Sequence, residues 1–125
     1  MKPDMQDTRF RILAVDDEPQ ATHTLKRILE LRGYNVQEEN DSTRALETAK
    51  RFHPDVVIVD YLMPNTDGGD VAWQLASEPS LKDTQVIMCS GVDAMEFRRK
   101  LPPKKIPILP KPLDSLALLE LLPTN

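Results

Sequence analysis

Residues 56–69 read VVIVDYLMPNTDGG, and this stretch decides the fold of the chain. Four apolar residues run without alternation up to Asp60, which is typical of a strand buried on both faces of a sheet. Turn-forming residues follow, and a helical pattern begins at about Gly69. The carboxylate of Asp60 is therefore expected at the carboxyl end of a central strand, where open α/β sheets form a ligand-binding crevice.

Similar apolar runs recur along the chain and alternate with helical patterns. We expect five strands, and the polar second run suits a sheet edge; they lie at 12–15, 35–39, 56–59, 86–89 and 106–109. We expect helices at about 21–32, 41–52, 69–76 and 114–122, with a short, poorly periodic one after Asp93. The alternation predicts an α/β fold, a doubly wound (βα)5 parallel sheet with helices on both faces.

The length of 125 residues fits one domain. We place it at 9–122, between a flexible N-terminal tail at 1–8 and a C-terminal tail at 123–125. The sequence has no apolar stretch of 18 residues, the length needed to cross a membrane, and its first residues have no hydrophobic signal region. A cytoplasmic location is therefore the default expectation. The single cysteine, Cys89, lies in an apolar run and is expected to be a buried, inert thiol.

The net charge of −4 argues against nucleic-acid binding, which needs a clustered basic face. The one local exception is the basic run RRKLPPKK at 98–105. We interpret this run as a solvated helix end, and a docking patch for an acidic partner is the alternative.

Four of the expected strands lead into polar residues that a purely structural sheet would not need. Asp16 and Asp17 follow the first strand, Asp60 ends the third, Ser90 follows the fourth and Lys111 follows the fifth. In a parallel sheet all of these ends face one crevice. Two carboxylates about 5 Å apart repel by roughly 3 kcal/mol at an effective dielectric near 20, so positive charge is needed. Lys111 supplies part of it, and Mg²⁺, with Mn²⁺ as an alternative, would supply the rest.

This set of residues suits phosphoryl transfer. Asp60 can act as the nucleophile and form an acyl phosphate. Mg²⁺ held by Asp17 and Asp60, with Asp16 partly through water, would neutralise phosphoryl oxygens on one side, and the Lys111 ammonium would do so on another. The Ser90 hydroxyl can donate to a phosphoryl oxygen, and its inward movement would shift the loop that follows it.

In combination, these motifs make the chain resemble a response-regulator receiver domain of two-component signalling, of the chemotaxis-regulator type. The resemblance covers 9–122 and rests on the acidic pair, on Asp60 with Met63-Pro64 and Asp67-Gly68 behind it, on Ser90, and on Lys111-Pro112. It implies a flavodoxin-like sheet with strand order 2-1-3-4-5.

The resemblance also implies roles for individual residues. Asp60 would be the phosphoacceptor, Mg²⁺ would be bound by Asp16, Asp17, Asp60 and the backbone carbonyl of Leu62, and Lys111, followed by a cis peptide bond, would contact the phosphoryl group. The donor would be a sensor histidine kinase or a histidine phosphotransfer protein, and the output a contact with a downstream effector protein, without direct DNA binding or membrane binding. Such a domain is no enzyme beyond catalysing its own phosphorylation and dephosphorylation.

Three residues depart from the pattern of the family. Members often carry an aromatic residue three positions before the lysine, where this chain has Ile108. We therefore expect the output to pass through loop and helix shifts between Ser90 and Leu101, or through changed backbone order. Leu62 and Val92 are apolar where polar side chains are common near the path of the attacking water. We therefore expect slow self-dephosphorylation.

Other interpretations remain for the same residues. Asp16-Asp17 alone could cap a helix, and Lys111 alone could be a surface lysine. An Asp-nucleophile phosphatase of the haloacid-dehalogenase type would want a second carboxylate at position 62, which is Leu62. A flavin-binding module would want a glycine- and hydroxyl-rich loop after the first strand, where this chain is acidic.

The route of the output is also open at this stage. No effector domain follows Leu122, so we expect either a protein contact or a piece cut from a hybrid kinase or a longer regulator. The expected contact surface comprises the fourth helix, the fifth strand and the fifth helix.

Overall fold

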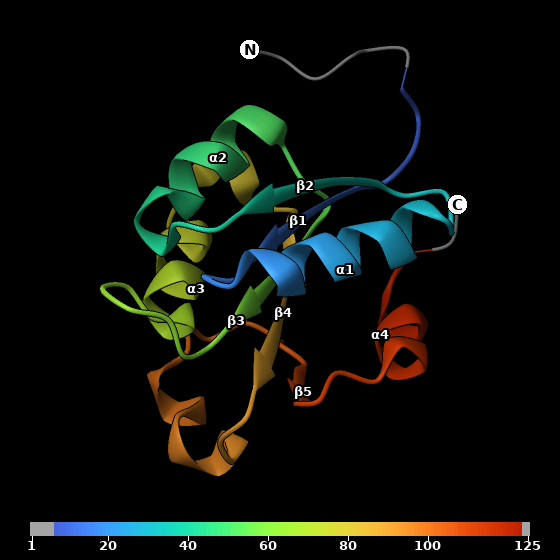
Figure 1. Ribbon diagram of the computed structural model, residues 1–125. Coiled ribbons are helices and arrows are strands. Elements are labelled where there is room, and N and C mark those ends of the chain that lie inside the picture. The colour runs from blue at the N-terminus through green and yellow to red at the C-terminus, as the bar shows by residue number, and fades with distance from the viewer. Residues whose placement is uncertain (1–6, 124–125) are drawn as a thin grey trace.

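The computed structural model describes residues 7–123, in which five parallel strands form a sheet with helices on both faces (Figure 1). The strands are β1 (Arg11–Val15), β2 (Asn35–Glu39), β3 (Val56–Asp60), β4 (Gln85–Ser90) and β5 (Ile108–Pro110). The helices are α1 (Pro19–Glu30), α2 (Ala45–Phe52), α3 (Gly68–Ala76) and α4 (Ser115–Leu121). The order β2-β1-β3-β4-β5 confirms the predicted flavodoxin-like topology.

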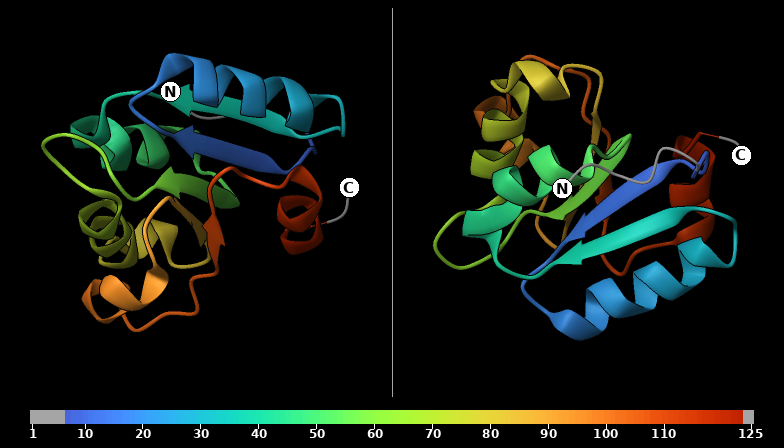
Figure 2. Two further views of the ribbon diagram at one scale, coloured as in Figure 1. Left: turned by 60° about the horizontal axis from the view of Figure 1, so that its bottom comes forward. Right: turned by 90° about the horizontal axis from the view of Figure 1, so that it is seen from above.

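The sheet buries one apolar cluster on each face because successive strand side chains point to opposite sides. Leu13 and Val57 belong to the cluster that packs against α2 and α3. Ile12 and Ile58 belong to the cluster under α1 and α4. Figure 2 shows the same division, with α1 and α4 on one side of the sheet and α2 and α3 on the other. The two-sided burial explains why β3 is apolar without alternation.

Local signals set the ends of the helices close to the predicted positions. α1 begins at Pro19, whose fixed φ suits the first helical turn, and the chain leaves it through Gly33 in the left-handed region, with φ 91°. α3 begins one residue earlier than expected because Asp67 and Asp70 form a reciprocal capping box. Asp41 caps a 3-10 turn at Ser42–Arg44 that leads into α2.

The predicted fourth helix is wrong: between β4 and β5 the structure has two 3-10 turns, Ala94–Glu96 and Arg98–Lys100, and no α-helix. Asp93 caps the first turn through its carboxylate, which accepts from the Met95 amide. The second turn ends at Leu101, whose backbone is extended because it precedes Pro102. The basic run at 98–105 is therefore not a solvated helix end.

β5 is shorter and begins later than expected. Pro107 cannot donate to a sheet ladder, although its carbonyl accepts from the Met88 amide, so the paired strand starts only at Ile108.

No helix within residues 7–123 combines the length and the apolar character that crossing a membrane would require. Most of the predicted tails, at 1–6 and 124–125, lies outside the described residues, and the domain boundaries stay a prediction.

Candidate phosphoacceptor site

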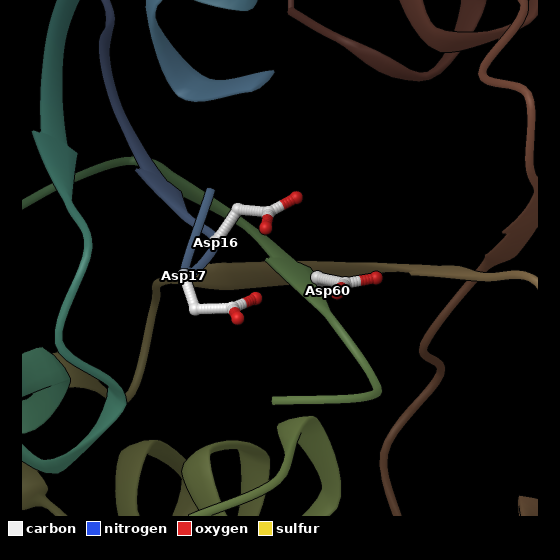
Figure 3. Close-up of side chains that lie close together, drawn as sticks. All are labelled: Asp16, Asp17 and Asp60. Carbon is white, nitrogen blue, oxygen red and sulfur yellow. The ribbon is translucent and has the colours of Figure 1, made fainter. Parts of the chain in front are cut away.

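The carboxyl edge of the sheet brings the three predicted carboxylates together. Asp16 and Asp17 follow the end of β1, and Asp60 is the last residue of β3, the neighbouring strand (Figure 3). One oxygen of each side chain lies within 4.8 Å of the other two. Asp60 is buried, Asp16 is half-buried and Asp17 is exposed, so the cluster opens from the sheet edge toward solvent.

Lys111 places a positive charge beside the carboxylate cluster. It follows β5, and its amide donates to the Ser90 carbonyl at 2.9 Å, which ties it to the end of β4. Its ammonium nitrogen lies 2.8 Å from Oδ1 of Asp60 and 3.5 Å from Oδ2 of Asp16. The peptide bond from Lys111 to Pro112 is cis, as the resemblance implied.

The electrostatics of the site favour additional positive charge. Burial raises the pKa of Asp60, the hydrogen bond from Lys111 lowers it, and the charge of Asp16 raises it again. Burial disfavours the charged form of Lys111, but the hydrogen bond and charges of Asp60 and Asp16 outweigh it and raise its pKa. One ammonium therefore does not fully compensate three carboxylates.

The donor set fits a hard divalent cation. Three carboxylates from the ends of two neighbouring strands, β1 and β3, offer only oxygen ligands, and two of the three are partly open to solvent, which leaves room for water ligands. Mg²⁺ binds one or two carboxylates and keeps several water ligands, whereas softer metals prefer imidazole or thiolate ligands, which this cluster does not offer.

Ser90 lies at the predicted strand end, and its hydroxyl is hydrogen-bonded to Val92 rather than to the carboxylates. Its side chain is 2% exposed, and its hydroxyl donates to the Val92 carbonyl and accepts from the Val92 amide, both at 3.0 Å. The hydroxyl thereby holds the first residues of the segment between β4 and β5. Donating the single hydroxyl proton to a phosphoryl oxygen would release the hydrogen bond to the Val92 carbonyl.

The three residues that depart from the family pattern occupy different environments. Leu62 is 58% exposed just beyond Asp60. Val92 and Ile108 are half-buried and pack against the α2 and α3 cluster. A ligand role for the Leu62 carbonyl stays a prediction.

Two further residues position the site: Asn40, which was not predicted from the sequence, and Gly68, which was quoted only as part of the motif behind Asp60. Asn40, after β2, donates from Nδ2 to the Asp16 carbonyl at 2.8 Å and so fixes the turn that carries the acidic pair. Gly68, the first residue of α3, donates to the Tyr61 carbonyl at 2.7 Å. A Cβ atom at Gly68 would lie 2.5 Å from the Asp60 carbonyl oxygen, so only glycine lets α3 approach the end of β3 this closely. The polar end of β2 was the available signal for Asn40.

An aromatic pair links the end of β3 to the segment after β4. Tyr61, next to Asp60, stacks on Phe97 with ring centroids 3.8 Å apart and planes inclined by 14°. Both rings are buried. No local pattern in the sequence predicts this contact because the two residues lie on different connections.

A cavity of about 450 Å³ opens beside the site, on the α1 side of the sheet. Asp16, Asp60 and Lys111 lie at its polar end, and Leu25 and Leu113 are among its apolar walls. Cys89 also lines it, and burial raises the pKa of this thiol to about 12, in keeping with the inert thiol predicted.

The fold and the site define a doubly wound domain with an acidic pocket at a strand switch point, and sequence comparison gives its family. Residues 12–122 match the family model described as response regulator receiver domain, and the chain belongs to this family. It is therefore a receiver domain of two-component signalling, and nothing in the comparisons supports the phosphatase alternative.

Curated relatives include two mycobacterial proteins. Response regulator MprA of Mycobacterium leprae is 38% identical over 89 residues, which are 71% of this chain and 38% of that protein. The probable transcriptional regulatory protein TcrX of Mycobacterium tuberculosis is 36% identical over 88 residues, 70% of this chain and 36% of that protein. The chain thus matches well under half the length of these relatives.

Solved structures agree over nearly the whole chain. A chemotaxis response regulator of Vibrio cholerae superposes with a TM-score of 0.80 at 26% identity, covering 90% of this chain and 95% of that one. The signal receiver domain of a signal transduction histidine kinase from Syntrophus aciditrophicus superposes with a TM-score of 0.78 at 29% identity, covering 89% and 85%.

Proposed function

We propose that this receiver domain takes a phosphoryl group on Asp60 and passes the signal on through a change in protein contacts. The observation that carries the proposal is the position of Asp60: a buried carboxylate at a strand end, 2.8 Å from the ammonium of Lys111 and grouped with Asp16 and Asp17. The domain would catalyse only its own phosphorylation and dephosphorylation.

The chemistry follows from these positions. An oxygen of the Asp60 carboxylate attacks phosphorus, the bond from phosphorus to the donor group breaks, and an acyl phosphate forms. Lys111 donates to a phosphoryl oxygen and balances its charge. Mg²⁺, or Mn²⁺, would be held by Asp16, Asp17, Asp60 and the Leu62 carbonyl and would supply charge neutralisation at the phosphoryl oxygens.

Ser90 is the residue through which the phosphoryl group would act on the rest of the domain. Turning its hydroxyl proton to a phosphoryl oxygen breaks its hydrogen bond to the Val92 carbonyl. The freed segment carries Phe97, which is stacked on Tyr61 beside the acceptor. A change at Ser90 therefore reaches the segment between β4 and β5 without an aromatic residue at position 108.

The proposed partners are those implied by the family. The donor would be a sensor histidine kinase or a histidine phosphotransfer protein, whose imidazole could approach Asp60 from the cavity beside Lys111. The output would be a contact with a downstream effector protein rather than with DNA or a membrane, given a net charge of −4. We assign both contacts to the cytoplasm.

Intact-protein mass spectrometry after incubation with acetyl phosphate and Mg²⁺ tests the acceptor. We expect one labile phosphoryl adduct, lost in Asp60→Asn and retained in Asp83→Asn, a matched change at an exposed aspartate. An adduct that persists in Asp60→Asn, or turnover of many phosphomonoesters, would refute the proposal. Lys111→Ala should uncouple whatever phosphorylation remains from the partner response.

The lifetime of the adduct tests the apolar surroundings of the acceptor. Leu62 and Val92 restrict a water molecule that attacks the phosphoryl group, so we expect loss of the adduct over minutes or longer once the donor is removed. Leu62→Asn should accelerate the loss, and Leu31→Asn, at a position 86% exposed on the far end of α1, should leave it unchanged. A lifetime of seconds in the unaltered protein contradicts this part of the proposal.

A further inference from the structure

The segment between β4 and β5 carries a group of cations that form no ion pairs within residues 7–123. We call Arg98, Arg99, Lys100, Lys104 and Lys105 the basic platform. All five are exposed, and none forms an ion pair with the described residues 7–123. From Phe97 to Leu113 the chain contains no acidic residue and six cations, the sixth being Lys111 of the site.

The rest of the chain has the opposite charge. The chain has 16 basic and 20 acidic residues, so removal of these six cations leaves 10 against 20, a net charge of −10. Positive charge is thus concentrated on one short segment of an otherwise acidic protein. Figure 1 shows this segment, in orange, beyond the tip of β4.

Buried residues hold the basic platform in a fixed conformation. Phe97, Leu101 and Ile106 are 2%, 9% and 4% exposed and alternate with the cations along the segment. The Lys100 amide donates to the Phe97 carbonyl at 2.8 Å, and the Lys104 amide donates to the Pro102 carbonyl at 2.7 Å. A backbone that is already ordered loses little conformational entropy when a ligand binds to it.

Apolar side chains accompany the cations. The indole of Trp73, on α3, is 46% exposed, and its N–H donates to the Lys100 carbonyl at 2.6 Å, so the ring lies at the border of the basic platform. Met95, in the preceding 3-10 turn, is 86% exposed. An exposed indole beside cations fits a ligand with both carboxylates and an apolar side chain.

We propose that the basic platform, with Trp73 at its border, binds an acidic peptide segment of a partner protein. Carboxylates of the segment pair with the five cations, and an apolar side chain packs on the indole. A short peptide covers only the platform, whereas a nucleic-acid duplex or a lipid bilayer extends past it and meets a surface whose net charge is −10. This surface is separate from the carboxylate cluster, and the unphosphorylated domain already presents it.

Titration of the unphosphorylated protein with a short synthetic peptide of glutamate and alanine residues with one phenylalanine tests the proposal. Amide NMR shifts should change at the basic platform and Trp73, with affinity measured by calorimetry. The charge reversal Arg98→Glu, Arg99→Glu, Lys100→Glu should weaken binding about tenfold or more, since it removes three ion pairs and adds repulsion. Trp73→Ala should weaken it a few-fold.

A matched variant separates local charge from net charge. Arg44→Glu, Arg51→Glu, Lys82→Glu changes the net charge equally at exposed positions outside the platform and should keep most of the affinity. Equal losses in the two variants, or peptide shifts elsewhere on the surface, would overturn the proposal. Platform-dependent binding of single-stranded DNA or of phosphatidylserine vesicles that exceeds binding of the peptide would also overturn it. Because no phosphodonor is present, the outcome is independent of the test of Asp60.

Discussion

Two neighbouring strands of this sheet lead into very different connections. After β3 the chain enters α3, whose start is fixed by a capping box and by the hydrogen bond from Gly68 to the Tyr61 carbonyl. After β4 it forms two isolated 3-10 turns held by the buried ring of Phe97 and by the Trp73 indole. Local sequence signals build the first connection, and contacts between distant residues build the second.

Thiol reactivity should show the largest difference between strand and connection. Cys89, on β4, has a pKa raised to about 12 by burial, against an ordinary value of 9.0. At pH 8 its thiolate fraction is therefore about a thousandfold lower than that of a free thiol, and alkylation by iodoacetamide should slow at least as much. Met95→Cys in a Cys89→Ser background, at an exposed position, should react at the rate of an unfolded peptide.

The raised pKa of Cys89 also makes the folding stability depend on pH. A thiol whose pKa is higher in the folded state than in the unfolded state adds no pH dependence below about pH 9 and costs stability as the pH rises from there toward 12. Rapid alkylation of Cys89 under native conditions would mean that β4 opens as readily as the segment that follows it.

Phe97→Ala should cause the largest loss of folding stability. The ring is 2% exposed and stacks on Tyr61, so its removal should lower the free energy of unfolding by about 3 kcal/mol in urea denaturation. Met95→Ala, two residues away and exposed, should change it by less than about 0.5 kcal/mol. A loss below about 1 kcal/mol for Phe97→Ala would show that the segment can detach while the sheet stays folded.

Gly68→Ala tests the close approach in the β3 connection. The added methyl group would lie 2.5 Å from the Asp60 carbonyl oxygen and 2.7 Å from the Tyr61 Cα, so backbone must move at a cost of about 2 kcal/mol. Gly91→Ala, in the β4 connection, meets nothing within 4 Å and should stay within about 0.5 kcal/mol. Similar thermal denaturation of the two variants would remove this difference between the connections.

The smallest expected difference concerns the caps. Asp67→Ala breaks the capping box of α3 and should cost about 1 kcal/mol. Asp93→Ala removes the cap of a three-residue turn and should cost less than about 0.5 kcal/mol, as measured by chemical denaturation. A larger loss at Asp93 would indicate that its turn is as strongly coupled to the core as α3.

The sheet and the residues at its strand ends could be predicted from the sequence. The five parallel strands, the two-sided burial of β3 and the positions of Asp16, Asp17 and Lys111 follow from periodicity and from the rule that parallel strand ends share one edge, whereas the strand order was implied by the resemblance to receiver domains. The clustering of the carboxylates was predicted for the same reason. Local patterns sufficed because each signal lies within a few residues of the element it specifies.

The conformation of the segment between β4 and β5 could not be predicted in this way. A polar cap at Asp93 and scattered apolar residues suggested a helix, but Pro102 forces Leu101 into an extended backbone. The stacking of Phe97 on Tyr61 depends on how two connections meet after the sheet has formed. The support that Asn40 gives to the acidic turn is likewise a contact between distant parts of the chain.

Trp73 is the only tryptophan of the chain, and its indole N–H is bonded to the Lys100 carbonyl. Emission excited at the red edge of the indole absorption, which the two tyrosines do not share, therefore originates from a single chromophore placed where α3 meets the segment after β4. If α3 and the segment after β4 separated, the indole would lose its hydrogen bond to the Lys100 carbonyl and become more exposed to water. Greater exposure to water shifts indole emission to longer wavelength. The protein thus contains its own optical probe for the one connection whose conformation its sequence did not reveal.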